Sequence, residues 1–174
     1  MMYGTRLPLR SILRQSALSG TISGLLMAAV IAGTSRMRTG RSAPGLNAVS
    51  HMFWGSQAGR QTNWSVRYTL NGLLLNQLAC LFWSGCFEAL YHDRPSNLPR
   101  QGVPHVIMLS FVAYLVDYHM VPKRCTPGFE LLFPRAWYPW LYAGLALSLW
   151  GGAQIPVPSL RQIAHREPVT GRFK

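Results

Sequence analysis

An apolar stretch from Thr69 to Tyr91 constrains the fold more than any other part of the sequence. As a helix it would extend ~34 Å, against a hydrocarbon core of roughly 30 Å. Small and polar residues recur within it at every fourth position: Gly72, Asn76, Cys80, Ser84 and Glu88. That spacing places them on one stripe of the helix, and a polar stripe that faced lipid would be costly. The stretch therefore predicts a transmembrane helix whose polar stripe packs against other helices.

Three more apolar blocks accompany this stretch, and together they indicate a membrane protein. Only 13% of the residues are charged, about half of the share in a soluble domain. We therefore expect an all-α integral membrane protein, a four-transmembrane-helix bundle. The expected spans are residues 16–34, 69–91, 103–121 and 136–153. They are joined by connections at 35–68, 92–102 and 122–135, between a basic, amphipathic N-terminal segment at 1–15 and a basic tail at 154–174.

The first apolar block also has the length of a signal-peptide core. Arg36, Arg38 and Arg41 follow it at once, however, and positive charge just beyond a cleavage site opposes translocation. A retained span is therefore favoured over a cleaved signal. The 17 Lys and Arg residues divide nine to eight between the two sides of a four-span chain. Because the two sides are so nearly equal, the positive-inside rule predicts neither orientation.

Small residues repeat at every fourth position through the first span: Ser16, Gly20, Gly24, Ala28 and Ala32. One face of this helix is therefore free of bulk, so that the backbone of a partner helix can approach closely. The natural partner is the polar stripe of residues 69–91. The residues expected at this helix contact are Gly20, Gly24, Ala28, Gly72, Asn76 and Ser84.

The connection at 35–68 is too polar to span a membrane, but part of it has helical periodicity. Leu46, Val49 and Phe53 recur near helical spacing, with polar residues between them. This pattern predicts an interfacial amphipathic helix at about 44–58, between the first two spans. Aromatic residues at both ends of the fourth span, among them Tyr138 and Tyr142, predict belts of contact with the membrane interface.

Chemically capable side chains gather in the first and third connections. In a bundle of alternating spans these connections emerge on the same side, which makes that side the candidate functional face. Its residues are His51, Asp117, His119, Lys123, Arg124 and Glu130. Glu88 is expected near the opposite end of the bundle, ~16 Å from Asp117 along the membrane normal at helical rise. Paired-carboxylate catalysis needs a separation of about 5 to 10 Å, so these two acids do not predict it.

Familiar catalytic and binding motifs are absent from the sequence. We find no HExxH zinc motif, no GxSxG nucleophile motif and no Walker phosphate loop, so no catalytic residue, metal or cofactor is assigned. The formal net charge is +12, but no zinc-finger or RNP-like motif accompanies it, and nucleic acid is not an expected partner. Basic residues between the apolar blocks instead favour a bilayer with anionic headgroups. A second copy of the chain or a partner membrane protein is also compatible with the pattern.

Two tracts, Asn47–Gly55 (NAVSHMFWG) and Asp117–Glu130, resemble segments of a group of small bacterial inner-membrane proteins with four predicted spans. The resemblance extends from about Pro44 through the fourth span and leaves out both basic ends. It implies a multi-pass protein of the bacterial inner (plasma) membrane. The group has no assigned activity, so the resemblance implies no site residues.

The sequence favours a non-enzymatic scaffold or accessory subunit, since its spans hold few deep charges and no broken-helix pair that would mark a substrate site. Two alternatives stay open. In a small transporter or channel, Asp117 would line a polar path with Asn76 and Gln77. In a membrane enzyme acting on a lipid headgroup, the chemistry would come from the face that holds His51, His119 and Glu130.

Overall fold

In this computed structural model the described residues are 9–90 and 102–155, and within those ranges every regular element is helical, which confirms the all-α class. The four long helices are α1 (Leu9–Thr39), α4 (Asn71–Leu90), α5 (Val103–Leu115) and α6 (Tyr138–Ala153). The start of the N-terminal segment, nearly all of the 92–102 connection and nearly all of the basic tail lie outside the described residues.

Three helical segments are long and apolar enough to cross a membrane, which indicates a membrane protein. They are Ile12–Thr39, Val66–Leu90 and Val103–Met120. The second includes the π-helical turn η2 (Val66–Leu70) before α4, and the third includes the π-helical turn η4 (Val116–Met120) after α5. Helix α6 has 16 residues and falls short of that length.

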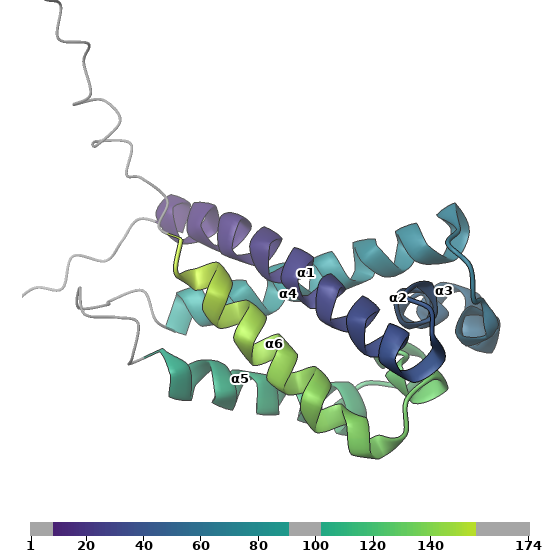
Figure 1. Cartoon of the computed structure of the whole chain (residues 1–174). Coiled ribbons are helices and arrows are strands. Elements are labelled where there is room, and N and C mark those ends of the chain that lie inside the picture. Colours follow the sequence, from purple (N-terminus) through teal and green to yellow (C-terminus); the bar gives the residue numbers. More distant parts are fainter. Residues whose placement is uncertain (1–8, 91–101, 156–174) are drawn as a thin grey trace, which may run out of the picture.

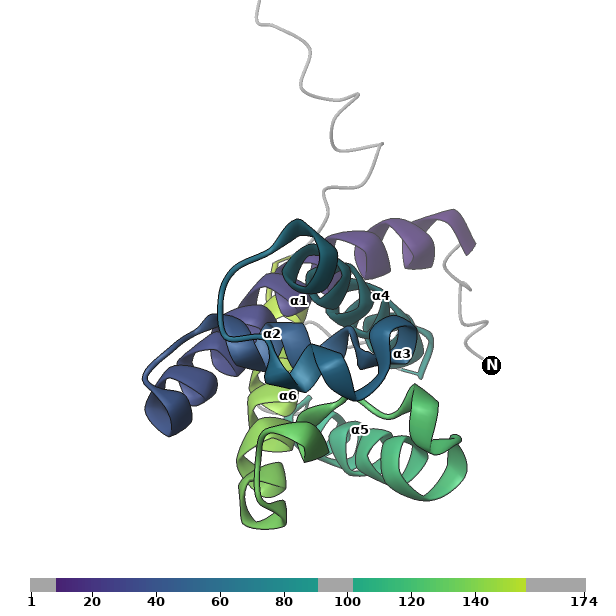
Figure 2. The same cartoon turned by 90° about the vertical axis from the view of Figure 1, so that its right-hand side faces the viewer.

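The four long helices alternate in direction and run side by side (Figure 1). Helix α1 makes its most extensive contacts with α4 and α6, whereas α5 contacts α6 and touches α4 only slightly. The short elements gather at one end of the bundle, where α2 (Ala43–Val49) and α3 (His51–Trp54) lie in front of the long helices in the end view (Figure 2). The first and third connections meet at this end, opposite the start of α1 (Figure 1).

The contact between α1 and α4 combines close approach with hydrogen bonds to the backbone. A Cβ placed on Gly20 would lie 2.8 Å from the Cα of Leu81, so only glycine fits there without movement. The Asn76 amide donates to the Gly24 carbonyl at 2.8 Å, and the Gln77 amide donates to the Gly20 carbonyl at 3.1 Å. The side-chain amides of α4 thus bond to the exposed carbonyls of α1, where small residues leave the backbone accessible.

Of the other residues expected at this contact, Ser84 contacts α1 as expected and Gly72 does not. The Ser84 hydroxyl lies 3.4 Å from that of Ser23 on α1, and Ala28 is half-buried against the core. Gly72 faces α2 instead of α1, because a Cβ there would collide with the carbonyl oxygen of Leu46. The small-residue stripe of α4 therefore packs against two helices, α1 and α2.

The segment predicted as an interfacial helix is helical but not continuous, and its first part does not lie at a surface. All seven residues of α2 are buried. Asn47 is fully enclosed because its amide donates to the carbonyls of Gln61 and Asn63, at 2.9 and 3.0 Å, while its oxygen accepts from Thr69 at 2.6 Å. A polar side chain whose hydrogen-bonding groups are all satisfied can lie in the protein interior. The polar residues of this segment therefore did not reveal that α2 is buried.

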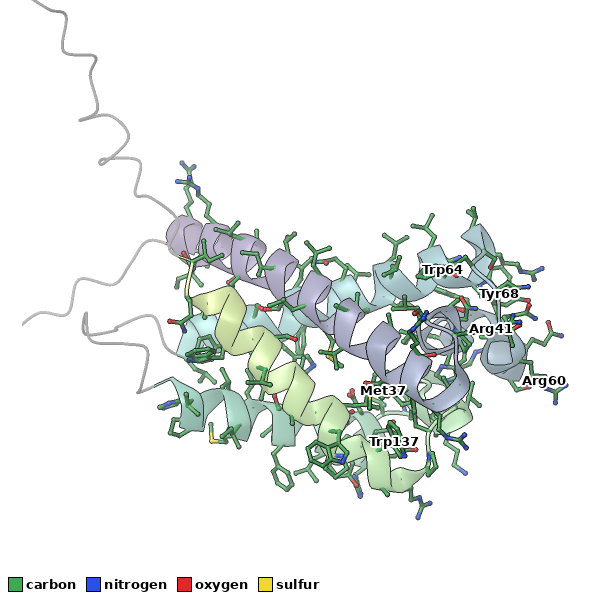
Figure 3. All side chains as sticks on the ribbon, in the orientation of Figure 1. Met37, Arg41, Arg60, Trp64, Tyr68 and Trp137 are labelled. Carbon is green, nitrogen blue, oxygen red and sulfur yellow. The ribbon has the colours of Figure 1, made fainter. Side chains whose placement is uncertain are left out.

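After α2, the chain turns outward at the same end of the bundle. The 3-10 helix η1 (Gly55–Arg60) begins at Gly55, whose φ is +61°, and the Trp54 indole donates to the Arg67 carbonyl at 3.1 Å. The Arg67 guanidinium lies 4.1 Å from the centre of the Trp54 ring. Figure 3 shows Arg60, Trp64 and other cationic and aromatic side chains around this end. Such a mixture is typical of a membrane–water interface.

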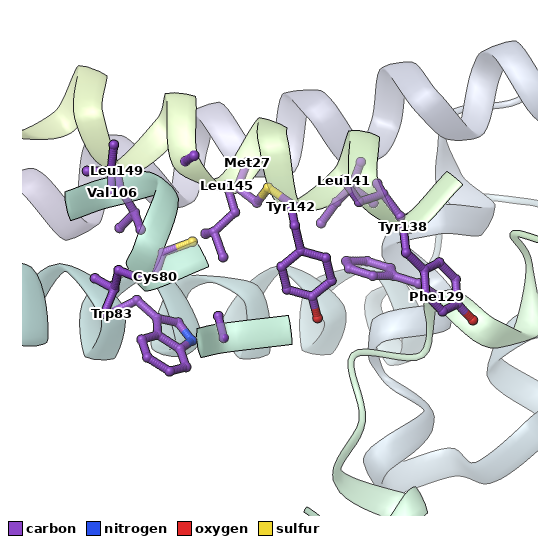
Figure 4. Packing of buried hydrophobic residues seen from close by; sticks show 14 of the residues in the cluster. Met27, Cys80, Trp83, Val106, Phe129, Tyr138, Leu141, Tyr142, Leu145 and Leu149 are labelled. Carbon is purple, nitrogen blue, oxygen red and sulfur yellow. The ribbon is translucent and has the colours of Figure 1, made fainter. Parts of the chain in front are cut away.

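Apolar side chains from all four long helices meet along the axis of the bundle. The buried set includes Met27 and Ile31 of α1, Cys80 and Trp83 of α4, Val106 and Leu109 of α5, and Leu141, Leu145 and Leu149 of α6. Figure 4 shows Met27, Cys80 and Leu145 between the helices, with Tyr142 directed from α6 into the same layer. The core continues into the short elements through Phe129 and Phe133.

Candidate functional site

A cluster of polar side chains lies where the first and third connections meet. Its centre is Glu130, so we call His51, Tyr118, Thr126 and Glu130 the Glu130 cluster. His51 Nε2 lies 3.8 Å from Glu130 Oε1, the Thr126 hydroxyl donates to the same oxygen, and the Tyr118 hydroxyl lies 3.4 Å from Oε2. His51 is buried, whereas the Glu130 side chain is 32% exposed. The carboxylate is thus held by interior groups and still reaches the surface.

Glycine at position 128 allows this cluster to form. Gly128 has a φ of +83°, in the left-handed region that side chains disfavour, and it begins the 3-10 helix η6 (Phe129–Leu131). A Cβ there would collide with the Ala48 carbonyl oxygen and lie 2.8 Å from His51 Nδ1. The loop can therefore press against α2 and α3 only because residue 128 has no side chain, and this contact buries His51.

Asp117 lies in a second polar group, inside the bundle. The Tyr142 hydroxyl donates to Asp117 Oδ2 at 2.6 Å. Both residues line a partly open cavity of about 130 Å³, which Asn76 and Thr126 also border. A π-helical turn such as η4 widens a helix by one residue. In the described structure that widened turn carries Asp117, which faces α6.

A groove of about 1110 Å³ lies between α5 and α6. Its walls are mainly aliphatic and aromatic, and they include Val103, Val106, Ile107, Phe111, Tyr114, Tyr118, Tyr138, Tyr142, Leu147 and Trp150. Tyr118 and Tyr138 stack across it with ring centres 4.7 Å apart. Ser110 lies midway along the groove, and its hydroxyl has no hydrogen-bond partner among the described residues.

Two basic side chains lie at one end of this groove: the imidazole of His119 at the end of η4, and the cationic guanidinium of Arg135 at the start of η7 (Arg135–Trp137). Both are exposed. The His119 ring contacts the Tyr114 ring, with centres 5.5 Å apart. Within residues 9–90 and 102–155, neither side chain has a hydrogen bond or ion pair with another residue. The groove therefore combines a long apolar wall with a positive mouth.

The structure divides the candidate functional face that the sequence indicates. It brings His51 and Glu130 together, but it places His119 in the groove and Asp117 against α6. Lys123 is exposed, and the Arg124 guanidinium donates to the Met52 carbonyl at 3.1 Å. No group of three or more His, Cys, Asp or Glu side chains in the described ranges is arranged to hold a metal ion.

Sequence reasoning missed the tyrosines of this region. Tyr142 is buried and bonded to Asp117, although its place at the start of an apolar block suggested an interface belt. Tyr118 links the groove to the Glu130 cluster. The signal available in the sequence was a pair of residues that could meet across the bundle. One is a tyrosine one turn inside an apolar block, and the other is an acid in the preceding block.

Comparisons with family models, with curated proteins and with solved structures find no match for this chain. The inference about function therefore rests on the residues and on their arrangement.

Proposed function

We propose that the chain is a four-span membrane scaffold or accessory subunit, which acts by binding rather than by catalysis. In this proposal α6 is the fourth span. Its 16 residues extend about 24 Å, and the turn η7 lengthens it at one end. It lies beside three helical segments that are able to cross a membrane (Figure 1). Because α1 and α5 both contact it, the membrane that holds them would enclose α6 as well.

Labelling of single cysteines tests this topology. In a cysteine-free background, Ser56→Cys reports on the end near α3 and Gln154→Cys on the end of α6; both positions are exposed. If α6 crosses the membrane, an impermeant thiol reagent added to oriented vesicles will label one of the two and not the other. Labelling of both from the same side would show that α6 does not cross.

The groove between α5 and α6 is the observation that carries the binding function. Polar side chains elsewhere in the bundle join its own helices, as Asn76 and Gln77 do. The groove, by contrast, is an apolar cavity of about 1110 Å³, at the upper end of the size of sites that bind small molecules. Exposed Ile107 and Phe111 line it. A membrane component that binds would use such a surface.

Photocrosslinking in native membranes tests whether the groove binds anything. A photoreactive residue at position 107 reports on the groove, and one at position 74, on an exposed part of α4, is the matched control. We expect a discrete adduct from position 107 that position 74 does not give. Equal adduct patterns from the two positions would remove the groove as a binding surface.

A bacterial inner-membrane location is a further part of the proposal. It is supported by the resemblance of Asn47–Gly55 and Asp117–Glu130 to the four-span group, and by basic residues that suit anionic headgroups. Separation of inner and outer membranes from cells that express the tagged chain tests it. The protein should sediment with the inner membrane, and recovery in the outer membrane would contradict the proposal.

One observation favours a small transporter or channel as a second candidate. Asn76 and Asp117 line the same cavity, although Gln77 bonds to α1 and would not take part. If a polar path runs through this cavity, Asp117→Asn should reduce proton or solute flux in vesicles while the protein still inserts. Flux that does not change would remove this candidate.

A further inference from the structure

We propose that the α5–α6 groove binds an anionic phospholipid, with its phosphate at Arg135 and His119 and its acyl chains along the apolar wall. This inference rests on the proposed binding function, since it names the occupant of the same groove. It differs from a general attraction of basic residues to a charged bilayer, because it assigns one site formed by a named cation, Arg135, and a named hydrogen-bonding group, the His119 imidazole.

The composition of the groove matches the two parts of a phospholipid. From Ile107 to Tyr114 along α5, and along the facing side of α6, the lining residues are almost all aliphatic or aromatic. Only at the end formed by η4 and η7 do the basic side chains Arg135 and His119 join the lining. A molecule that fills the groove thus needs a hydrocarbon body and an anionic group at one end.

The charge at that end is available to a ligand. Arg135 has no hydrogen bond or ion pair with any described residue. The nearby acids Asp117 and Glu130 accept hydrogen bonds from Tyr142 and Thr126, and neither forms an ion pair with Arg135. A guanidinium presents its donors in a planar fork that fits two phosphate oxygens. Arg135 is therefore the main phosphate-binding group of the site.

The position of the mouth also suits a headgroup. His119 and Arg135 lie at the end of the third candidate span and just before α6, where the aromatic residues of that region gather. Side chains at such a level meet lipid phosphates and not acyl chains. A second copy of the chain would bring its own basic residues to this mouth, which charge repulsion disfavours.

Retention of lipid by the purified full chain tests the proposal. The protein is incubated in detergent with equal amounts of phosphatidylglycerol and phosphatidylcholine of identical acyl chains, and the bound lipid is measured by native mass spectrometry. We expect phosphatidylglycerol to be retained in preference. Arg135→Gln should reduce that preference by about fivefold, the typical effect of one cation near a charged headgroup.

Arg60→Gln is the matched control, since Arg60 is exposed at the same end of the bundle but lies on η1 and not in the groove. It removes the same charge, so an equal loss of preference in both variants would show diffuse attraction and overturn the proposal. No preference in the unaltered chain would overturn it as well.

A groove-filling variant, Ala143→Trp, separates this inference from the proposed function. If it releases lipid of either headgroup while Arg135→Gln changes nothing, the groove binds but the charged site is wrong. If it releases nothing, both the inference and the binding function fail. Dimers that Ala143→Trp abolishes would identify a second copy as the occupant, and they would also overturn the lipid proposal.

Discussion

The α1–α4 contact and the α5–α6 contact are built in opposite ways. In the first, Gly20 lets two backbones approach, and Asn76 and Gln77 donate to carbonyls of the facing helix. In the second, large apolar side chains leave a groove of about 1110 Å³ between the helices, which also contact each other through the rings of Tyr114 and Tyr142. The first contact fixes the fold, and the second leaves a surface for a ligand. Mutations should therefore affect stability at one contact and binding at the other.

The largest loss of stability is expected from Gly20→Leu. Any side chain there meets the Leu81 backbone, so the helices must separate and lose their hydrogen bonds, at a cost of at least about 3 kcal/mol. Unfolding in mixed detergent micelles measures the change. Gly33→Leu is the control, because a Cβ at Gly33 meets nothing within 4 Å. Equal effects of the two would contradict a close α1–α4 contact.

Tyr142→Phe is expected to destabilise the fold by about 2 kcal/mol, because it removes a hydrogen bond to a carboxylate inside the bundle. Asp117 is the residue through which η4 is tied to α6. Tyr114→Phe provides the comparison, since the Tyr114 hydroxyl bonds to no other described residue while its ring joins the same cluster. If both variants unfold at the same detergent concentration, the Asp117 bond has no energetic role.

Asn76→Ala should cost about 0.6 kcal/mol, the average for a hydrogen bond between membrane helices. Ile107→Ala in the groove should have a smaller effect on unfolding, because Ile107 is 58% exposed. In photocrosslinking from a neighbouring groove position, Ile107→Ala should lower the yield of the adduct more than Asn76→Ala does. The contrast between the two contacts would be disproved if Ile107→Ala lowered stability more than Asn76→Ala.

The smallest effect is expected from Ser110→Ala, which should raise stability by a few tenths, up to about 1 kcal/mol. The buried Ser110 hydroxyl has no partner in the described part of the chain, so its removal relieves a desolvation cost. Ser148→Ala is the matched change on α6, where the hydroxyl donates to the Gly144 carbonyl at 2.7 Å. Ser148→Ala should leave the stability unchanged or lower it. If Ser110→Ala lowered the stability, the Ser110 hydroxyl would have a hydrogen bond that the structure does not show.

Patterns that depend on one helix were readable in the sequence. The recurrence of small residues at every fourth position identifies Gly20 and Gly24, which contact α4. The apolar blocks predict the all-α class. The helix ends were less accessible, since α1 already begins at Leu9 and the π-helical turns η2 and η4 extend α4 and α5 without a break. Local hydropathy does not encode such extensions, because tertiary contacts decide them.

Features that depend on two distant segments were not readable. Asn47 is buried because carbonyls of residues 61 and 63 happen to face it, and Tyr142 because η4 turns Asp117 towards α6. The groove exists because α5 contacts α6 and barely touches α4. Each of these features depends on a contact between distant segments. A single sequence shows the residues that make such a contact, but not that they meet.

The complete burial of α2 has a consequence for how the chain is made. This seven-residue helix is enclosed by α1 and α4 on one side and by Gly128 and η6 on the other, and these neighbours are separated by most of the sequence. During synthesis α2 emerges long before residue 128 does. Its burial is therefore completed only after the third connection has been translated, late in the synthesis of the described part of the chain.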